Sequence, residues 1–288
     1  MIQERLKALR AEMEKRGITV YVVPTADFHE SEYVGDHFKA RKFITGFTGS
    51  AGTAVITLDE AGLWTDGRYF VQAENQLKDS TVTLYRMGEE GVPTVDEFVK
   101  DRLKEGGCLG FDGRVVNGTW GGRLEKIAAE KNVSMHVTED LIDLIWEDRP
   151  ALSKQPLFIL EEKYSGKSTA DKIGDLRKAM KENGADVHIL TSLYDIAWLL
   201  NIRGNDIDYV PVVLSYLVLN ETECIWFLQE EVVDDKIRAY LEENHITTKP
   251  YDAIYDYVPE IPADAVVLMN RGTVNYRIVN SLDKAIKR

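Results

Sequence analysis

The five histidines are the first residues to test for metal chemistry, because zinc sites are usually built from clustered His, Cys and carboxylate ligands. The segment His29-Glu-Ser-Glu-Tyr33 is close to the zinc-binding helix motif, in which a second histidine follows four residues after the first. Tyr33 stands where that second histidine is needed. No other histidine has a partner at ligand spacing, so we expect ordinary surface or core histidines. A carboxylate-only site stays open, although no acidic cluster stands out.

Serine chemistry is the second candidate, in the segment Gly46-Phe-Thr-Gly-Ser-Ala-Gly52. A nucleophile elbow needs glycine two residues on either side of the serine, and Thr48 breaks that pattern around Ser50. The phosphate-binding patterns Gly-Lys-Ser/Thr and G-x-G-x-x-G are also absent. We interpret the glycines, Gly49 among them, as turn residues that allow positive φ and close backbone approach before a strand. The alternative is a loop that approaches a ligand or a partner subunit.

Arg68 is the most distinctive charged residue of the first half, in Trp64-Thr-Asp-Gly-Arg-Tyr-Phe70. We expect a helix that starts near Asp66 and is capped by it, which puts Arg68 in the first turn. A cation there is unfavourable against the helix dipole. We therefore expect Arg68 to pair with a carboxylate of its own domain, and the alternative is a reach into a neighbouring active site.

The second half has a corresponding polar segment, Trp198-Leu-Leu-Asn-Ile-Arg-Gly-Asn-Asp206. Arg203 and Asp206 have opposite charges three positions apart, and we expect them to form an internal ion pair. Lining a cleft is the alternative for both residues.

The elements that must position these residues occur twice. Four residues recur with the same displacement of 167 positions (173 − 6): Leu6, Leu9, Met13 and Gly17 return as Ile173, Leu176, Met180 and Gly184. Each set predicts an amphipathic helix that ends at the glycine and is followed by a buried strand. A repeat this long predicts two related domains rather than a solenoid. We place them at 1–150 and 151–288, with the break in the proline-containing segment 146–156.

Helices and strands alternate in both halves, which predicts α/β domains, and a hairpin at 51–65 predicts a mixed sheet. In the first half we expect helices at 4–16, 66–76, 94–104 and 119–130 and strands at 18–23, 51–57, 61–65, 81–86, 107–111 and 133–137. In the second half we expect helices at 168–183, 194–200, 232–243 and from about 275. Its expected strands are 186–190, 211–219, 223–229 and 265–269.

Composition limits the partners and the compartment. The net charge of −13 argues against nucleic-acid and anionic-membrane binding, which both need a basic face. The longest apolar stretch, 210–219, falls far short of the roughly 20 residues that cross a bilayer. We expect no signal peptide, since the N-terminus is charged. Cys108 and Cys224, one in each half, are expected to be buried free thiols in a reducing cytoplasm.

Five ordered segments together resemble the long, three-domain Xaa-Pro aminopeptidases (aminopeptidase P), a metallopeptidase family: 27–33, 47–53, 64–70, 145–150 and 196–206. The resemblance covers nearly the whole chain. It implies two creatinase-type N-terminal domains, each a mixed β-sheet flanked by helices, and it implies that the pita-bread catalytic domain of the family is absent here. The full enzyme would remove the N-terminal residue preceding proline, with a metal-bridging hydroxide attacking the scissile carbonyl.

The resemblance also implies roles for this chain. The two metal ions, usually manganese, belong to the third domain, so we expect no cofactor and no activity in this chain alone. We expect it to support a cytoplasmic homodimer and to cover the cleft that receives Xaa-Pro peptides. The candidate contact residues are Gly49, Ser50, Arg68, Trp198, Arg203 and Asp206. The alternatives are a free-standing pseudoenzyme or peptide-binding module, and a cofactor-binding α/β enzyme, which would need a glycine-rich strand-to-helix turn that we do not find.

Overall fold

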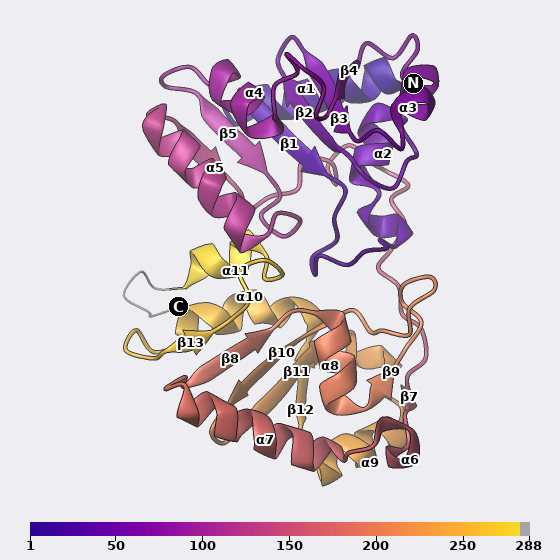
Figure 1. Ribbon diagram of the computed structural model, residues 1–288, viewed down its shortest axis with the longest axis vertical. Coiled ribbons are helices and arrows are strands. Elements are labelled where there is room, and N and C mark those ends of the chain that lie inside the picture. Colours follow the sequence, from indigo (N-terminus) through magenta and orange to yellow (C-terminus); the bar gives the residue numbers. More distant parts are fainter. Residues whose placement is uncertain (283–288) are drawn as a thin grey trace. The chain divides into compact units, whose positions relative to one another are not determined.

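The computed structural model describes residues 1–282, which form two units (Figure 1). Unit 1 comprises Met1–Phe28 and Asp36–Ala151. Unit 2 comprises the described residues from Leu152 onward together with the short segment His29–Gly35. A piece of the first half of the chain is therefore part of the second unit.

Unit 1 contains a six-stranded sheet in the order β4-β3-β2-β1-β5-β6. Its strands are β1 (Val20–Pro24), β2 (Thr53–Thr57), β3 (Ala61–Thr65), β4 (Thr83–Arg86), β5 (Cys108–Phe111) and β6 (Ser134–His136). The sheet is mixed, because β2 is antiparallel to both β1 and β3 while the other pairs are parallel. The helices are α1 (Ile2–Lys15), α2 (Ala40–Thr45), α3 (Phe70–Gln76), α4 (Val95–Arg102) and α5 (Gly118–Glu130), with a 3₁₀ turn η1 (Asp36–Phe38).

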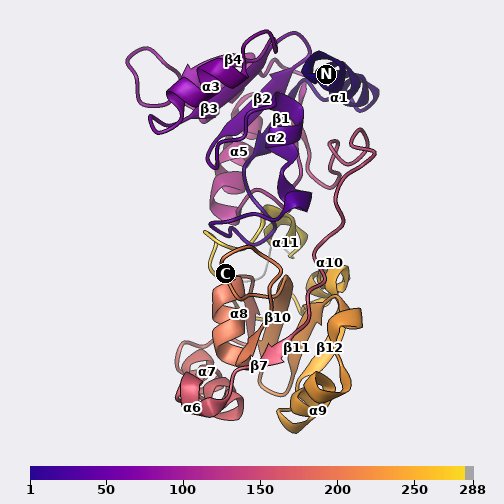
Figure 2. The same ribbon diagram turned by 90° about the vertical axis from the view of Figure 1, so that its right-hand side faces the viewer.

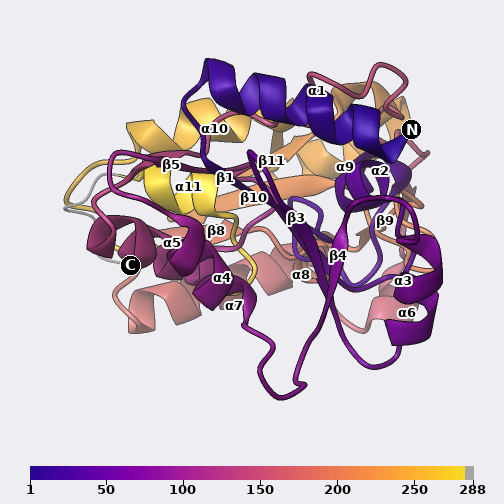
Figure 3. The ribbon, with the colours of Figure 1, turned by 90° about the horizontal axis from the view of Figure 1, so that it is seen from above.

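Helices cover both faces of this sheet, which is why every residue of β1 is buried. Tyr21 and Val23 belong to one core together with Leu6 and Met13 of α1. Since side chains alternate along a strand, Val20 and Val22 face the opposite layer. Figure 3 shows α1 and α2 on one side of the strands and α4 and α5 on the other. Such two-sided burial is typical of an α/β unit.

Unit 2 contains a five-stranded sheet in the order β12-β11-β10-β8-β13. Its strands are β8 (Val187–Leu190), β10 (Ser215–Asn220), β11 (Cys224–Leu228), β12 (Thr247–Pro250) and β13 (Val267–Leu268), and a separate pair joins β7 (Phe158–Ile159) to β9 (Ile202–Arg203). The helices are α6 (Glu162–Ser165), α7 (Thr169–Glu182), α8 (Leu193–Leu200), α9 (Asp235–Glu243), α10 (Ile254–Tyr257) and α11 (Tyr276–Ser281), with 3₁₀ turns η2 (Glu230–Val232), η3 (Tyr251–Ala253) and η4 (Val258–Glu260). Figure 2 shows α7 and α8 on one side of the sheet and α10 on the other.

The internal repeat predicted from the sequence is a repeat of topology. Displacing α1 by 167 positions gives the bounds of α7, Thr169–Glu182. Strands β8, β10, β11, β12 and β13 take the places of β1 to β5, with the same parallel and antiparallel pairings. Gly17 and Gly184 follow the two helices with φ of +67° and +65°, a left-handed conformation that glycine adopts without strain.

Several sequence-based bounds differ from the structure. The helix expected from Asp66 begins at Phe70 with Tyr69 as its N-cap, because Asp66 is engaged by Arg68 instead of by helix amides. The strand expected at 211–219 begins at Ser215, since the Leu214 amide bonds to the Asp206 side chain. Helix α2 and strand β12 are among the elements that the sequence did not predict: α2 has only six residues, too few to show a helical period, and β12 is mostly polar and exposed. No helix among the described residues has the length and apolarity to cross a membrane.

Candidate functional sites

A buried arginine holds the glycine loop of unit 1, residues 46–52. The Arg41 side chain is 3% exposed and donates from Nη1 to the Phe47 carbonyl (2.5 Å), from Nη2 to the Gly49 carbonyl and from Nε to Thr25 Oγ1 (2.9 Å). Its guanidinium also lies 4.7 Å from the centre of the Phe47 ring. No described carboxylate forms an ion pair with it, and burial lowers the pKa of Arg41 to about 10. The loop therefore takes its shape from a cation that has no counter-ion among the described residues.

Gly49 and Ser50 lie in this loop and show what the glycines do there. A Cβ on Gly49 would lie 2.2 Å from the Phe47 ring, so the residue must be glycine for lack of space. Gly46 has φ of +77° and ends α2, as a turn glycine does. The Ser50 hydroxyl bonds to the Tyr69 hydroxyl at 2.6 Å and has no histidine or carboxylate partner among the described residues. Nothing in this arrangement activates Ser50 as a nucleophile.

Arg68 has the carboxylate partner that the sequence predicts. Its Nε and Nη2 atoms donate to the two oxygens of Asp66, both at 2.8 Å. The hydrogen bonds from Arg68 lower the pKa of Asp66 to about 2. The helix-dipole reason for this pairing is wrong, however, because Arg68 precedes the first residue of α3. Arg68 is 70% exposed and lies 5.3 Å from the Tyr69 ring, so Asp66, Arg68, Tyr69 and Ser50 form a continuous polar surface that we call the Arg68 cluster.

The expected ion pair between Arg203 and Asp206 is wrong. Arg203 Nη1 donates to the carbonyls of Ala197 and Ile202, the latter at 3.1 Å. Asp206 accepts from the backbone amides of Gln155 (3.1 Å) and Leu214 (2.9 Å). Burial raises the pKa of the Asp206 carboxyl. Each side chain therefore holds backbone groups in place by hydrogen bonds. The spacing of the two residues along the sequence does not reveal this function.

Trp198 is held by a buried lysine that sequence reasoning missed. The Lys172 side chain donates to the Trp198 carbonyl (2.7 Å) and to Asn201 Oδ1 (2.6 Å), and its Nζ lies 4.5 Å from the indole. Burial lowers the pKa of Lys172. Trp198 itself is 55% exposed. The signal for Lys172 is its place beside Ile173 on the buried stripe of α7, where a lysine is rarely found without partners.

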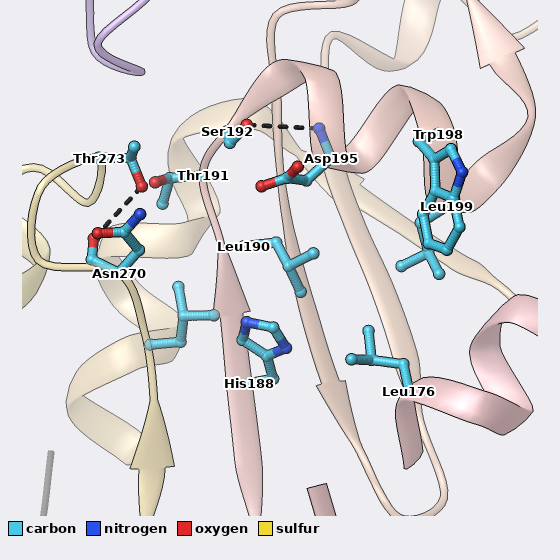
Figure 4. Close-up of a pocket in the computed structure, with 11 residues that line it drawn as sticks. Leu176, His188, Leu190, Thr191, Ser192, Asp195, Trp198, Leu199, Asn270 and Thr273 are labelled. Carbon is cyan, nitrogen blue, oxygen red and sulfur yellow. Dashed lines mark hydrogen bonds between the residues drawn. The ribbon is translucent and has the colours of Figure 1, made fainter. Parts of the chain in front are cut away.

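Trp198 also borders a pocket of about 210 Å³ in unit 2, beside α8 (Figure 4). Strand β8, helices α7 and α8 and the segment between β13 and α11 all contribute to its wall. The lining residues are Leu176, His188, Ile189, Leu190, Thr191, Ser192, Asp195, Trp198, Leu199, Asn270 and Thr273.

Metal ligands are not gathered in the described part of the chain. Residues 1–282 contain no group of three or more His, Cys, Asp or Glu side chains that would hold a metal ion. Cys108 and Cys224 are both buried and free, as the sequence predicts, and burial raises the pKa of the Cys224 thiol to about 12.

His29 is a core histidine of unit 2, in agreement with the sequence interpretation. It is 2% exposed, and its ring nitrogens lie 3.0 Å from the Thr191 carbonyl and 2.6 Å from the Tyr251 hydroxyl. Its bonds to Thr191 and Tyr251 join the segment His29–Gly35 to the rest of unit 2.

Comparison with known proteins places this architecture. Family models described as the creatinase/prolidase N-terminal domain match residues 5–145 and, separately, residues 148–288. The chain is 41% identical over 261 residues to a Coprinopsis cinerea protein named "Probable Xaa-Pro aminopeptidase P", covering 90% of this chain and 42% of the relative. It is 35% identical over 294 residues to aminopeptidase P2 of Arabidopsis thaliana, covering 100% of this chain and 41% of the relative.

A solved structure extends the match to three dimensions. The crystal structure of X-prolyl aminopeptidase from Caenorhabditis elegans, described as a cytosolic enzyme with a di-nuclear active site, superimposes with a TM-score of 0.93 at 31% identity. The match covers 100% of this chain and 49% of that one, so the chain spans less than half the length of these relatives. The chain matches the N-terminal region of X-prolyl aminopeptidases, and it belongs to the creatinase/prolidase N-terminal domain family, whose domain it carries twice.

Proposed function

We propose that this chain is the non-catalytic N-terminal region of a manganese-dependent Xaa-Pro aminopeptidase, which as a whole removes an N-terminal residue preceding proline. In that longer protein the chain supports a homodimer and covers the active-site cleft, and by itself it is inactive. The supporting observation is the match over its whole length to the C. elegans X-prolyl aminopeptidase at 31% identity. Since that relative is described as cytosolic, we also propose a cytoplasmic location.

The described residues do not fit a di-nuclear metal site, because they bring together no group of three or more metal-ligating side chains. Two metal ions linked by a bridging group need several carboxylate or histidine ligands within one cavity. We therefore assign no metal-dependent step to this chain and propose that the metal ligands belong to the rest of the longer protein.

The roles proposed for the candidate residues follow from their environments. Arg68 is exposed and already oriented by Asp66, so its outer guanidinium edge is ready to bind a carbonyl or carboxylate with little loss of side-chain entropy. Ser50 lies in the same cluster, and Gly49 keeps the loop beneath it close to Phe47. In unit 2 the exposed indole of Trp198 is the contact candidate.

Arg203 and Asp206 are positioning residues in this proposal. Both bond to backbone groups and hold the segments on either side of β9. One observation also favours the second candidate function, a peptide-binding module: the exposed Trp198 ring lies next to the pocket of unit 2.

Substitution of Arg68 by alanine in the longer enzyme is expected to raise KM or lower kcat by about tenfold, since one charge-assisted hydrogen bond contributes about 1.5–3 kcal/mol. The melting temperature should stay within about 1 °C, because an exposed ion pair contributes little to stability. Steady-state kinetics on an Xaa-Pro peptide, together with thermal unfolding, measures both quantities.

Arg123 supplies a matched control in the same unit. It is 55% exposed and forms one ion pair, with Asp96 at 3.0 Å, outside the Arg68 cluster. Arg123→Ala should leave kcat and KM unchanged. If the Arg68→Ala and Arg123→Ala enzymes have equal kinetic parameters, Arg68 does not contact the substrate or the active site.

A further inference from the structure

The pocket of unit 2 has an apolar wall and, beside it, an acidic group that has no cationic partner in the described part of the chain. Leu190 of β8, Leu199 of α8 and Leu176 of α7 supply the apolar side. Asp195, on the first turn of α8, forms no ion pair with any described residue. Figure 4 shows its carboxylate on the side of the pocket that carries Thr191 and Asn270, with Leu176 and Trp198 on the opposite side.

A hydrogen-bond donor lies on the same side of the pocket as this carboxylate. Asn270 Oδ1 accepts from the Gly272 amide at 2.9 Å, which identifies the other side-chain atom as Nδ2, the donor group. That NH₂ group has no partner within residues 1–282 in the structure. The pocket therefore presents an anion and an amide donor on its polar side.

His188 also lines the pocket, and its imidazole is uncharged at neutral pH. Burial lowers the pKa of His188, while the nearby Asp195 charge acts in the opposite direction with a smaller effect. At neutral pH the imidazole thus carries no positive charge that would compete with a ligand for the Asp195 carboxylate.

We propose that this pocket binds an α-amino acid unit with an apolar side chain, through its free α-ammonium group and the adjacent carbonyl oxygen. The ammonium group pairs with Asp195, the Asn270 amide donates to the carbonyl oxygen, and the side chain packs against Leu176, Leu190 and Leu199. A free amino acid and the N-terminal residue of a peptide share this chemistry. The inference rests on the geometry of unit 2 and holds whether or not the longer protein is a peptidase.

The size of the pocket agrees with one residue. Sites for drug-sized ligands usually enclose about 300–1,000 Å³, and this pocket encloses about 210 Å³. A single apolar residue fills such a space, whereas an extended peptide would continue past Trp198 into solvent. An anionic ligand is disfavoured because Asp195 is the charged group of the pocket wall.

The test titrates the 288-residue chain with L-leucine, with the tripeptide Leu-Pro-Pro and with N-acetyl-leucinamide, which lacks the ammonium group. Two-dimensional NMR follows the His188 imidazole and the α8 amides, and calorimetry gives the affinity. We expect saturable binding of leucine with Kd of about 1 mM, as is reasonable for so few atoms, and no binding of the acetylated compound. Equal binding of the tripeptide assigns the site to peptide N-termini, and its failure to bind assigns the site to free amino acids.

Helix α7 supplies a matched control variant. Asp195 and Asp171 occupy the same position, the third residue of a helix whose N-cap serine accepts their backbone amide. Asp195→Asn should weaken leucine binding at least tenfold, and Asp171→Asn, which changes the same helix position outside the pocket, should not. The proposal is overturned if leucine does not bind, if N-acetyl-leucinamide binds as well, or if both variants behave alike.

Discussion

Replacing His29 by alanine is expected to lower the free energy of unfolding of unit 2 by about 3–4 kcal/mol, from lost packing and two lost buried hydrogen bonds. The Thr191 carbonyl can only accept, so His29 Nδ1 carries the proton that it donates there (3.0 Å). His29 Nε2 is then an acceptor for the Tyr251 hydroxyl at 2.6 Å. The ring also lies 4.5 Å from the ring of the buried Tyr216. Removal of the imidazole leaves a carbonyl and a hydroxyl without these partners in the core.

Hydrogen exchange of the β8 and β10 amides measures this loss, because those strands form the centre of the unit 2 sheet. A double-mutant cycle with Tyr251→Phe isolates the His29–Tyr251 bond, for which we expect a coupling of about 1–2 kcal/mol. A loss below about 1 kcal/mol in the His29→Ala chain would show that the segment His29–Gly35 contributes little to unit 2.

Replacing Arg41 by methionine is expected to destabilise unit 1 by about 2–3 kcal/mol, because the carbonyls of Phe47 and Gly49 lose their donors while the volume is nearly kept. In the Arg41→Met chain, hydrogen exchange should speed up more for the amides of the glycine loop than for the amides of β1 and β2. The reason is that Arg41 is the side chain that joins Thr25 to the loop carbonyls. Hydrogen exchange measures both effects in one experiment.

Arg5 is the matched control for Arg41. It also donates to a carbonyl, that of Phe43 at 2.8 Å, and lies 4.1 Å from the Phe43 ring, but it is only half-buried and makes this single hydrogen bond. We expect Arg5→Met to destabilise unit 1 by less than about 1 kcal/mol. If Arg41→Met has no larger effect than Arg5→Met, the glycine loop keeps its shape without the buried cation.

The fold was predictable from the sequence wherever a local signal and burial agree. The apolar stripe of Leu6, Leu9 and Met13 and its return 167 positions later predict α1 and α7 with bounds close to those observed. Strand β12 was not predictable, because three of its four residues, among them Lys249, are polar. Its strand conformation comes from pairing with β11, a tertiary contact.

The candidate sites were predictable only in part, since they depend on contacts between distant segments. The Arg68–Asp66 pair spans two positions, and proximity in sequence suffices to expect it. Asp206 instead bonds to the Gln155 amide, 51 positions away, so the local partner Arg203 was the wrong expectation. Arg41 belongs to no recognisable sequence motif. Its role is visible only in the structure, where it donates hydrogen bonds to the carbonyls of Phe47 and Gly49.

The most direct test of the proposed function is hydrolysis of a short Xaa-Pro peptide by the 288-residue chain, with added Mn²⁺ and with a chelator in parallel. A mock purification from the same host controls for contaminating peptidases. We predict no turnover above this control, because the chemistry belongs to the rest of the longer protein. Chelator-sensitive turnover that survives stringent purification and exceeds the mock sample would contradict the assignment of this chain as a non-catalytic region.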